Sequence, residues 1–465
     1  MTNAQTKKER NLLKVANQEY NNLRYAYSIP FYKKYLSIYP NDTLALKNMA
    51  SAYQNVNQFT MSATTLFIFV ILYFLVLLGV AKITGKNSNN MSFFIGNKNS
   101  NWMLVAFGMI GTSLSGVTFV SVPGAVGKDA FHYLQITLGY LIGYLAIAYV
   151  LLPIYYKLNL TSIYNYLEGR LGFSAYKTGA SFFILSRTLG ATARLYLVVK
   201  ILQYFILDNM HVPFWATTVV ILVMILLYTY EGGVKTIVWT DTLQTSGMLM
   251  GLIICSIYIL SELDLNVIQG LTAMQNQALA NNPSMHLADV FSMDVNSKSF
   301  FLKQIIGGSF VTLTMTGLDQ EMMQKNISVK NLKDAQKNMV TIGFTMLIAI
   351  SLFLYLGGLL HLYAAQNNIT ATGDDLFPTL ALNHMPPYLS IIFILALISA
   401  LFPSADGAIT ALTSSFCIDI LGLQRNKNLS EAEQKKIRQR THLTFALIFL
   451  ILVLVFKWID NKSTI

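Results

Sequence analysis

The sequence predicts an all-α, polytopic membrane protein. Hydrophobic residues make up 54% of the 465 positions, charged residues only 12%, and the mean hydropathy is +0.49. Soluble domains carry about 25% charged residues, roughly twice this share. Apolar segments close to the roughly 20 residues that cross a bilayer recur from residue 64 to residue 457. Both cysteines, Cys255 and Cys417, lie inside such segments, which argues against a disulfide framework or a metal cluster.

Residues 1–60 form a different unit. They are polar and contain no apolar core of the kind that a cleaved signal peptide has. The stretch AYSIPFYKKYLSIYPNDTLALKNMASAY, residues 26–53, places aromatic and small residues at helical spacing. It resembles a fragment of a tetratricopeptide repeat, and the alternative is an ordinary amphipathic helical hairpin. Because the composition changes abruptly at Met61, we expect residues 1–60 to be a fusion or a gene-boundary artefact. The sequence does not indicate which protein, if any, residues 1–60 bind.

Ten apolar segments follow. A lead helix is predicted at residues 64–83. Nine core helices, numbered 1 to 9 in chain order, are predicted at residues 102–126, 131–156, 175–207, 214–230, 236–261, 300–323, 338–365, 387–416 and 441–457.

Lysine and arginine are distributed unequally between the two sets of loops. We assign 17 of these residues to the loops after the lead helix and after core helices 2, 4, 6 and 8, against 4 on the opposite side. Cytoplasmic loops carry such an excess, so the richer side is predicted to be cytoplasmic and the N-terminus to lie outside an inner, or cell, membrane. The net charge of +11 therefore reflects membrane topology, and no nucleic-acid partner is expected.

Core helix 8 contains the stretch LFPSADGA, residues 401–408, with Pro403 and Asp406 in an otherwise apolar run. A carboxylate in the bilayer costs about 2.5–3.5 kcal/mol on insertion scales and therefore needs a partner. Pro403 is expected to open the helix backbone.

Core helix 1 contains GMIGTSLSGVTFVSVPG, residues 108–124, whose glycines predict a break that exposes carbonyl groups. Close packing through small residues is the alternative for this segment.

Further charged residues lie in core helices 3, 5 and 6. Asp241 is placed about two turns into core helix 5, and Asp319 near the inner end of core helix 6, where it can cap a helix or pair with Lys325. Arg187 and Arg194 of core helix 3 are seven residues apart, so they share one helix face. They either pair structurally, which we favour, or bind an anionic solute.

The chain resembles the sodium/solute symporter family over residues 61–465. The resemblance rests on GGVKTIVWTDTLQ (residues 232–244), GLDQEMMQK (317–325), GTSLSG (111–116) and the core helix 8 run. It implies two inverted repeats of five helices, Na⁺ as the coupling ion, and a main sodium site between broken core helix 1 and core helix 8. The implied sodium ligands are Gly111, Leu114, Ala400, Pro403 and Ser404. A second sodium position is implied between Asp241 and Asp406. The family usually has a hydroxyl residue where this chain has Pro403.

The family resemblance predicts a secondary active transporter that moves a small organic solute with Na⁺ by alternating access, and not an enzyme. Ser115, Thr118, Asp319 and Arg194 are the expected solute-binding residues. A tenth core helix is missing from the expected five-plus-five arrangement, so the chain is also expected to be a truncated, inactive product. The remaining alternative is a membrane-anchored sensor or scaffold that does not transport. The sequence leaves a sugar, a carboxylate and an amino acid open as the solute.

Overall fold

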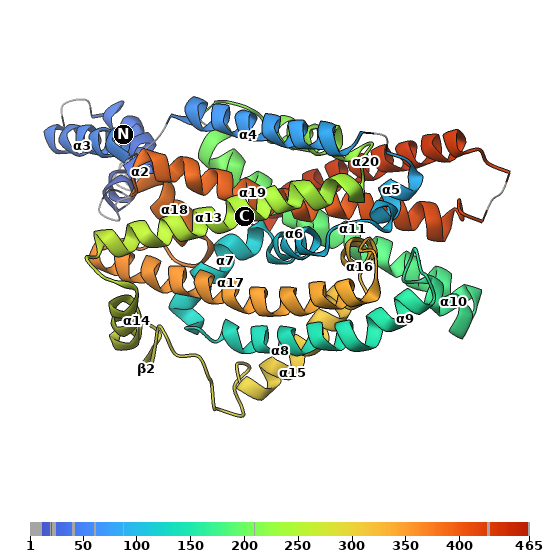
Figure 1. The fold of residues 1–465 in the computed structure, drawn as a ribbon. Coiled ribbons are helices and arrows are strands. Elements are labelled where there is room, and N and C mark those ends of the chain that lie inside the picture. Colours follow the sequence, from blue (N-terminus) through green and yellow to red (C-terminus); the bar gives the residue numbers. More distant parts are fainter. Residues whose placement is uncertain are drawn as a thin grey trace.

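The computed structural model describes residues 12–463, except residues 19, 21–24, 40–41, 60–61, 87, 209 and 426–427. Long helices lie side by side in one bundle, and a small helical unit is attached at one end (Figure 1). The strands among the described residues are β1 (Ala278–Leu279) and β2 (Asn282–His286), which form one short antiparallel hairpin. The predicted all-α class is therefore confirmed.

The small unit at the N-terminal end is a helical hairpin. It consists of α2 (Tyr25–Leu36) and α3 (Thr43–Phe59), with residues 12–18 also helical. The Tyr32 ring is buried between these segments, and its hydroxyl donates a hydrogen bond of 2.6 Å to Asn17 Oδ1. Helix α3 contacts α18 (Leu376–Asn383) of the bundle. The predicted boundary at Met61 lies outside the described residues.

Seven helices of the described chain are long and apolar enough to cross a membrane: Thr64–Thr84, Tyr133–Lys157, Phe173–Leu202, Val234–Glu262, Leu332–Gln366, Pro387–Ile420 and Glu431–Asp460. The bent pair α6 (Trp102–Leu114) and α7 (Gly116–Asp129) makes an eighth candidate, and α12 (Phe214–Thr229) is a shorter apolar helix. The helical elements that make up the seven spans are α4 (Ala63–Thr84), α8 (Tyr133–Ala146), η2 (Ile147–Leu151), α9 (Leu152–Lys157), α11 (Phe173–Leu202), α13 (Val234–Glu262), α17 (Leu332–Gln366), α19 (Pro387–Ser415), η6 (Phe416–Ile420) and α20 (Glu431–Ser463).

Core helix 6, predicted as one span, is broken. It consists of α15 (Phe301–Thr312), η4 (Leu313–Gly317) and α16 (Gln320–Ile327). The break falls at Asp319, whose carboxylate accepts a hydrogen bond of 3.1 Å from the Met322 backbone and so starts a new helix. Core helices 1 and 6 are therefore both broken, and each is the first helix of one predicted repeat.

Helix α19 lies at the centre of the bundle. In its most apolar window 78% of the residues are buried, against 28% for both α4 and α20. It packs against α6, α7, α11 and α13. Polar side chains on α19 are therefore shielded from lipid by protein on most sides.

The connecting elements gather at the two ends of the bundle (Figure 1). One end carries α5 (Asn90–Ile95), η1 (Gly96–Lys98), α10 (Asn165–Leu171) and α16. The other end carries α14 (Val267–Asn276), the β1–β2 hairpin, η5 (Gly373–Asp375) and α18. Lys325 is one of the 17 basic residues that the sequence analysis assigned to the loops, but it is only 2% exposed and belongs to the interior, because it lies in α16 at the break of core helix 6. The end that carries α5 and α10 still has the excess of basic residues when Lys325 is left out of the count.

Gly139 of α8 and Gly308 of α15 bring these two helices into close contact. A Cβ atom at Gly308 would overlap the carbonyl group of Ile136, whereas nothing lies within 4 Å of a Cβ atom at Gly307. We expect Gly308→Ala to destabilise the protein by about 1–3 kcal/mol, because packed backbones must separate. Gly307→Ala is the matched control and is expected to be neutral or stabilising. Thermal unfolding in detergent measures both, and equal midpoints for the two variants would contradict this description of the contact.

Candidate functional site

Core helix 1 breaks at Ser115, as its glycines predict. Helices α6 and α7 meet there at an angle of 59°, and Ser115 has a φ of 29°, which is rare for a residue other than glycine. The last four carbonyl groups of a helix have no partner within it, and in α6 these belong to residues 111–114. The break therefore makes the Gly111 and Leu114 carbonyl oxygens available to a ligand.

The break lies directly against α19. A Cβ atom at Gly116 would lie 3.5 Å from Leu401 Cα, which is van der Waals contact distance, so the two backbones are close neighbours at this point. Pro403 and Ser404 follow within one turn of Leu401. The Ser404 side chain is 2% exposed, and its hydroxyl oxygen has no hydrogen-bond partner in the described structure. A buried polar atom without a partner is uncommon and indicates a place for a ligand or an ion.

Pro403 does not open the helix, contrary to the expectation from sequence. Helix α19 runs without interruption from Pro387 to Ser415. The proline ring lacks an N–H group, so the Ser399 carbonyl one turn earlier loses its helical hydrogen bond. Because α19 is held by neighbouring helices on most sides, the loss of one hydrogen bond does not bend it. One of these contacts is a hydrogen bond of 2.6 Å that the Ser399 hydroxyl of α19 donates to the Tyr73 hydroxyl of α4.

Asp406 is fully buried and is held by hydrogen bonds. Its carboxylate accepts from the Tyr228 hydroxyl at 2.8 Å and from the Gly407 backbone N–H at 2.5 Å. Among the described residues it has no ion pair with a basic side chain. An ionised carboxylate in such surroundings favours a nearby cation.

Asp241 has a different partner. Its Oδ2 atom accepts from Lys325 Nζ at 2.7 Å and from the Thr112 hydroxyl at 3.3 Å, while Oδ1 has no partner. Lys325 Nζ also donates to the Thr112 hydroxyl at 2.7 Å and lies 3.7 Å from Glu321 Oε1. In the structure, the partner of Asp241 is therefore the ammonium group of Lys325, where the family resemblance implied a second sodium ion.

The same group of charges extends to core helix 3. The Arg187 guanidinium is paired with Glu321 and lies 3.7 Å from Asp319 Oδ2. Structural pairing, the reading favoured from sequence, therefore holds for Arg187. The sequence reasoning missed Glu321, Thr112 and Tyr228, and it named Lys325 as a possible partner of Asp319, whereas Lys325 pairs with Asp241. One signal was present, since Glu321 and Lys325 are spaced i,i+4 and face one side of a helix.

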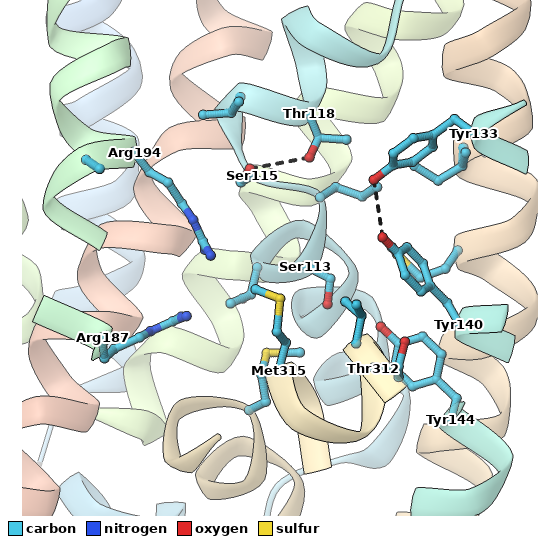
Figure 2. Close-up of a pocket in the computed structure, with 18 of the residues that line it drawn as sticks. Ser113, Ser115, Thr118, Tyr133, Tyr140, Tyr144, Arg187, Arg194, Thr312 and Met315 are labelled. Atoms are coloured by element: carbon cyan, nitrogen blue, oxygen red, sulfur yellow. Dashed lines mark hydrogen bonds between the residues drawn. The ribbon is translucent and has the colours of Figure 1, made fainter. Parts of the chain in front are cut away.

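A cavity of about 400 Å³ lies beside the break in core helix 1. This volume is within the range of small-molecule sites. Ser115 and Thr118 line it from the break, and Arg187 and Arg194 reach into it from α11 (Figure 2). The facing wall consists of side chains from α8, α15, η4 and α17, including Tyr133, Tyr140, Tyr144, Thr312, Met315, Met346 and Ile350.

Three of the four expected solute residues share this cavity: Ser115, Thr118 and Arg194. Asp319 does not line it, because its carboxylate caps α16 and faces Arg187. In the described structure Arg194 forms no ion pair, whereas Arg187 is neutralised by two carboxylates. Arg194 is therefore the basic group of the cavity that remains available to a solute.

The cavity continues toward one end of the bundle, and hydrogen bonds join the helices at the other end. A second cavity of about 450 Å³ shares Val117 and Leu197 with it and reaches Asp374 and Asp375 of η5. At the opposite end, Asp419 accepts hydrogen bonds from Ser162, Ser415 and Tyr176 at 2.8, 2.7 and 3.0 Å.

Arg425 and Glu168 form a second contact at the same end as Asp419, through two hydrogen bonds of 2.9 and 2.5 Å. These hydrogen bonds raise the pKa of Arg425. Together with the Asp419 contacts, they tie the loop after core helix 2 to the end of core helix 8.

Comparisons with known proteins agree with this arrangement. The model of the sodium:solute symporter family matches residues 93–464. The chain is 25% identical over 401 residues to a sodium/sialic acid symporter of Aliivibrio fischeri, which covers 83% of this chain and 75% of that protein. It is 27% identical over 260 residues to the sodium/iodide cotransporter of Homo sapiens, which covers 56% of this chain and 39% of that protein.

A solved structure shares the fold. It is described as a substrate-bound, outward-open state of a Na⁺-coupled sialic acid symporter, and the match has a TM-score of 0.75 at 20% identity. The match covers 86% of this chain and 83% of the other. The predicted helical symporter fold is confirmed by this likeness.

Proposed function

Because this chain belongs to the sodium:solute symporter family, we propose that it transports a small organic anion across a membrane by Na⁺-coupled symport with alternating access. One observation carries the proposal. The break at Ser115 ends α6, so that the Gly111 and Leu114 carbonyl groups have no partner within the helix, and it also forms one wall of the cavity that contains Arg194. An ion and a solute bound on the two sides of one break stabilise the same backbone conformation, and such coupling is reciprocal.

The sodium ion binds between α6 and α19. The Gly111, Leu114, Ala400 and Pro403 carbonyl oxygens and the Ser404 hydroxyl surround it. The unpartnered Ser404 hydroxyl, and the carbonyl groups that the break leaves free at the end of α6, support this assignment. Oxygen atoms of this kind are the ligands that alkali cations take in broken-helix transporters. Asp406, close by on α19, adds a negative charge that favours the cation.

The solute carries a carboxylate. Arg194 supports this choice, because it is the available guanidinium in a cavity otherwise lined by hydroxyl and apolar groups. Guanidinium and carboxylate pair through two parallel hydrogen bonds. Ser115 and Thr118 hydrogen-bond further polar groups of the solute, and the tyrosines of α8 pack against its body.

The protein lies in the cell (inner) membrane, with its N-terminal unit outside. The excess of basic residues at the end that carries α5 and α10 supports a cytoplasmic location for that end. In this orientation the second cavity opens outward, and the Asp419 contacts close the cytoplasmic side.

Uptake into proteoliposomes tests the function. An inward Na⁺ gradient is expected to drive accumulation of radiolabelled N-acetylneuraminate or lactate, and an equal K⁺ gradient is not. The neutral polyol myo-inositol is the control solute. Uptake that is equal with either cation gradient would contradict Na⁺ coupling, and Na⁺-driven uptake of myo-inositol alone would contradict an anionic solute.

A further inference from the structure

Lys325 is a buried cation that has no role in the proposed sodium and solute sites. It is 2% exposed and lies in α16, just after the break of core helix 6. Its ammonium group lies 2.7 Å from Asp241 Oδ2 of α13 and 2.7 Å from the Thr112 hydroxyl of α6. The side chain thus connects the first helix of each predicted repeat to core helix 5.

The surroundings of this ammonium group are those of a small bound cation. Carboxylate and hydroxyl oxygens contact it, Glu321 Oε1 lies 3.7 Å away, and a Cβ atom at Gly407 would be 3.1 Å from Nζ. The absence of a side chain at Gly407 therefore lets the α19 backbone approach the ammonium directly beside Asp406. A lysine ammonium is a compact point charge, unlike the planar guanidinium of arginine.

The carboxylate of Asp241 retains capacity for another ligand. Its Oδ1 atom is buried and has no hydrogen-bond partner in the described structure, although Oδ2 is shared by two donors. The Thr245 hydroxyl, one turn later on α13, is also buried without a partner. Removal of the ammonium would leave a charged carboxylate and free oxygens shielded from water, which is an unfavourable arrangement without a cation.

We propose that Lys325 is a tethered cation that occupies the position between Asp241 and core helix 8, so that this protein binds one sodium ion per cycle and not two. The proposal rests on the proposed function, because it fixes the sodium stoichiometry of that symport. The sodium ion at Ser404 is unaffected, whereas a second ion is excluded by the ammonium charge.

Equilibrium binding of ²²Na⁺ to the purified full chain, without solute, tests the proposal. The wild type is expected to bind one ion per protein, and Lys325→Met, which keeps the length and removes the charge, is expected to bind two. Lys337→Met is the matched control, because Lys337 is 52% exposed and pairs with Asp334 on the surface of α17. It is expected to bind one ion.

The outcomes separate this proposal from the proposed function. Two ions in the wild type, or one in folded Lys325→Met, would overturn the role of Lys325 and leave Na⁺ coupling intact. No bound ion in the wild type would overturn the proposed function itself. The double variant Lys325→Met/Asp241→Asn removes both charges of the pair and avoids an unpaired carboxylate. It is expected to bind one ion, and two would show that Asp241 does not hold the second ion.

Discussion

Replacing Arg194 with glutamine is expected to weaken binding of the anionic solute at least a hundredfold, or about 2.8 kcal/mol. The reason is that Arg187, the other guanidinium of the cavity, is already paired with Glu321 and Asp319. No second basic side chain that lines the cavity can replace the lost contact. Truncating one member of a buried, hydrogen-bonded charge pair typically costs about 2–5 kcal/mol, which includes the expected value.

Isothermal titration of N-acetylneuraminate at saturating Na⁺ measures this effect. Arg194→Lys is expected to recover part of the affinity, because it keeps the charge but not the bidentate geometry. Arg170→Gln, at an exposed position in α10, is the control and is expected to bind like the wild type. An Arg194→Gln variant with unchanged affinity would remove Arg194 from the solute site.

Replacing Asp406 with asparagine is expected to lower sodium affinity at least tenfold, or about 1.4 kcal/mol. The change keeps the size of the side chain and removes one negative charge from a site shielded from water, where charge interactions are strong. Solute affinity at low Na⁺ is expected to fall with it and to recover at saturating Na⁺, because the coupling is reciprocal. Sodium titration of solute binding gives both quantities.

Two controls make this result specific. Tyr228→Phe removes the hydroxyl that donates to Asp406 but keeps the carboxylate, so sodium affinity is expected to change less than in Asp406→Asn. Asp334→Asn alters a carboxylate at the surface of α17 and is expected to have no effect. A sodium midpoint that is unchanged in Asp406→Asn would leave Ser404 and the carbonyl groups as the ligands.

The features that were predictable from sequence are local. Clustered glycines and hydroxyl residues predicted the break of core helix 1, because such a segment forms a poor continuous helix. The apolar lengths predicted the lead helix and seven of the core helices as elements of the bundle. The assignment of the loops rich in basic residues to the cytoplasmic side stays a prediction.

The features that were missed depend on contacts between distant segments. Lys325 and Asp241 are 84 residues apart, and the sequence placed Lys325 in a loop because it follows an apolar run. Core helix 6 was predicted as continuous because its break at Asp319 involves a capping carboxylate and no glycine cluster. Pro403 was expected to open core helix 8, but packing on several sides keeps that helix intact.

The central claim is that sodium at the break of core helix 1 and the anion in the neighbouring cavity bind cooperatively. The most direct measurement is the dissociation constant of N-acetylneuraminate for the purified protein, in Na⁺ and in K⁺ at equal ionic strength, paired with the ²²Na⁺ dissociation constant with and without the anion. We predict that Na⁺ tightens anion binding at least tenfold and that the anion tightens Na⁺ binding by the same factor. Equal anion affinity in Na⁺ and K⁺, with Na⁺ affinity insensitive to the anion, would contradict the account.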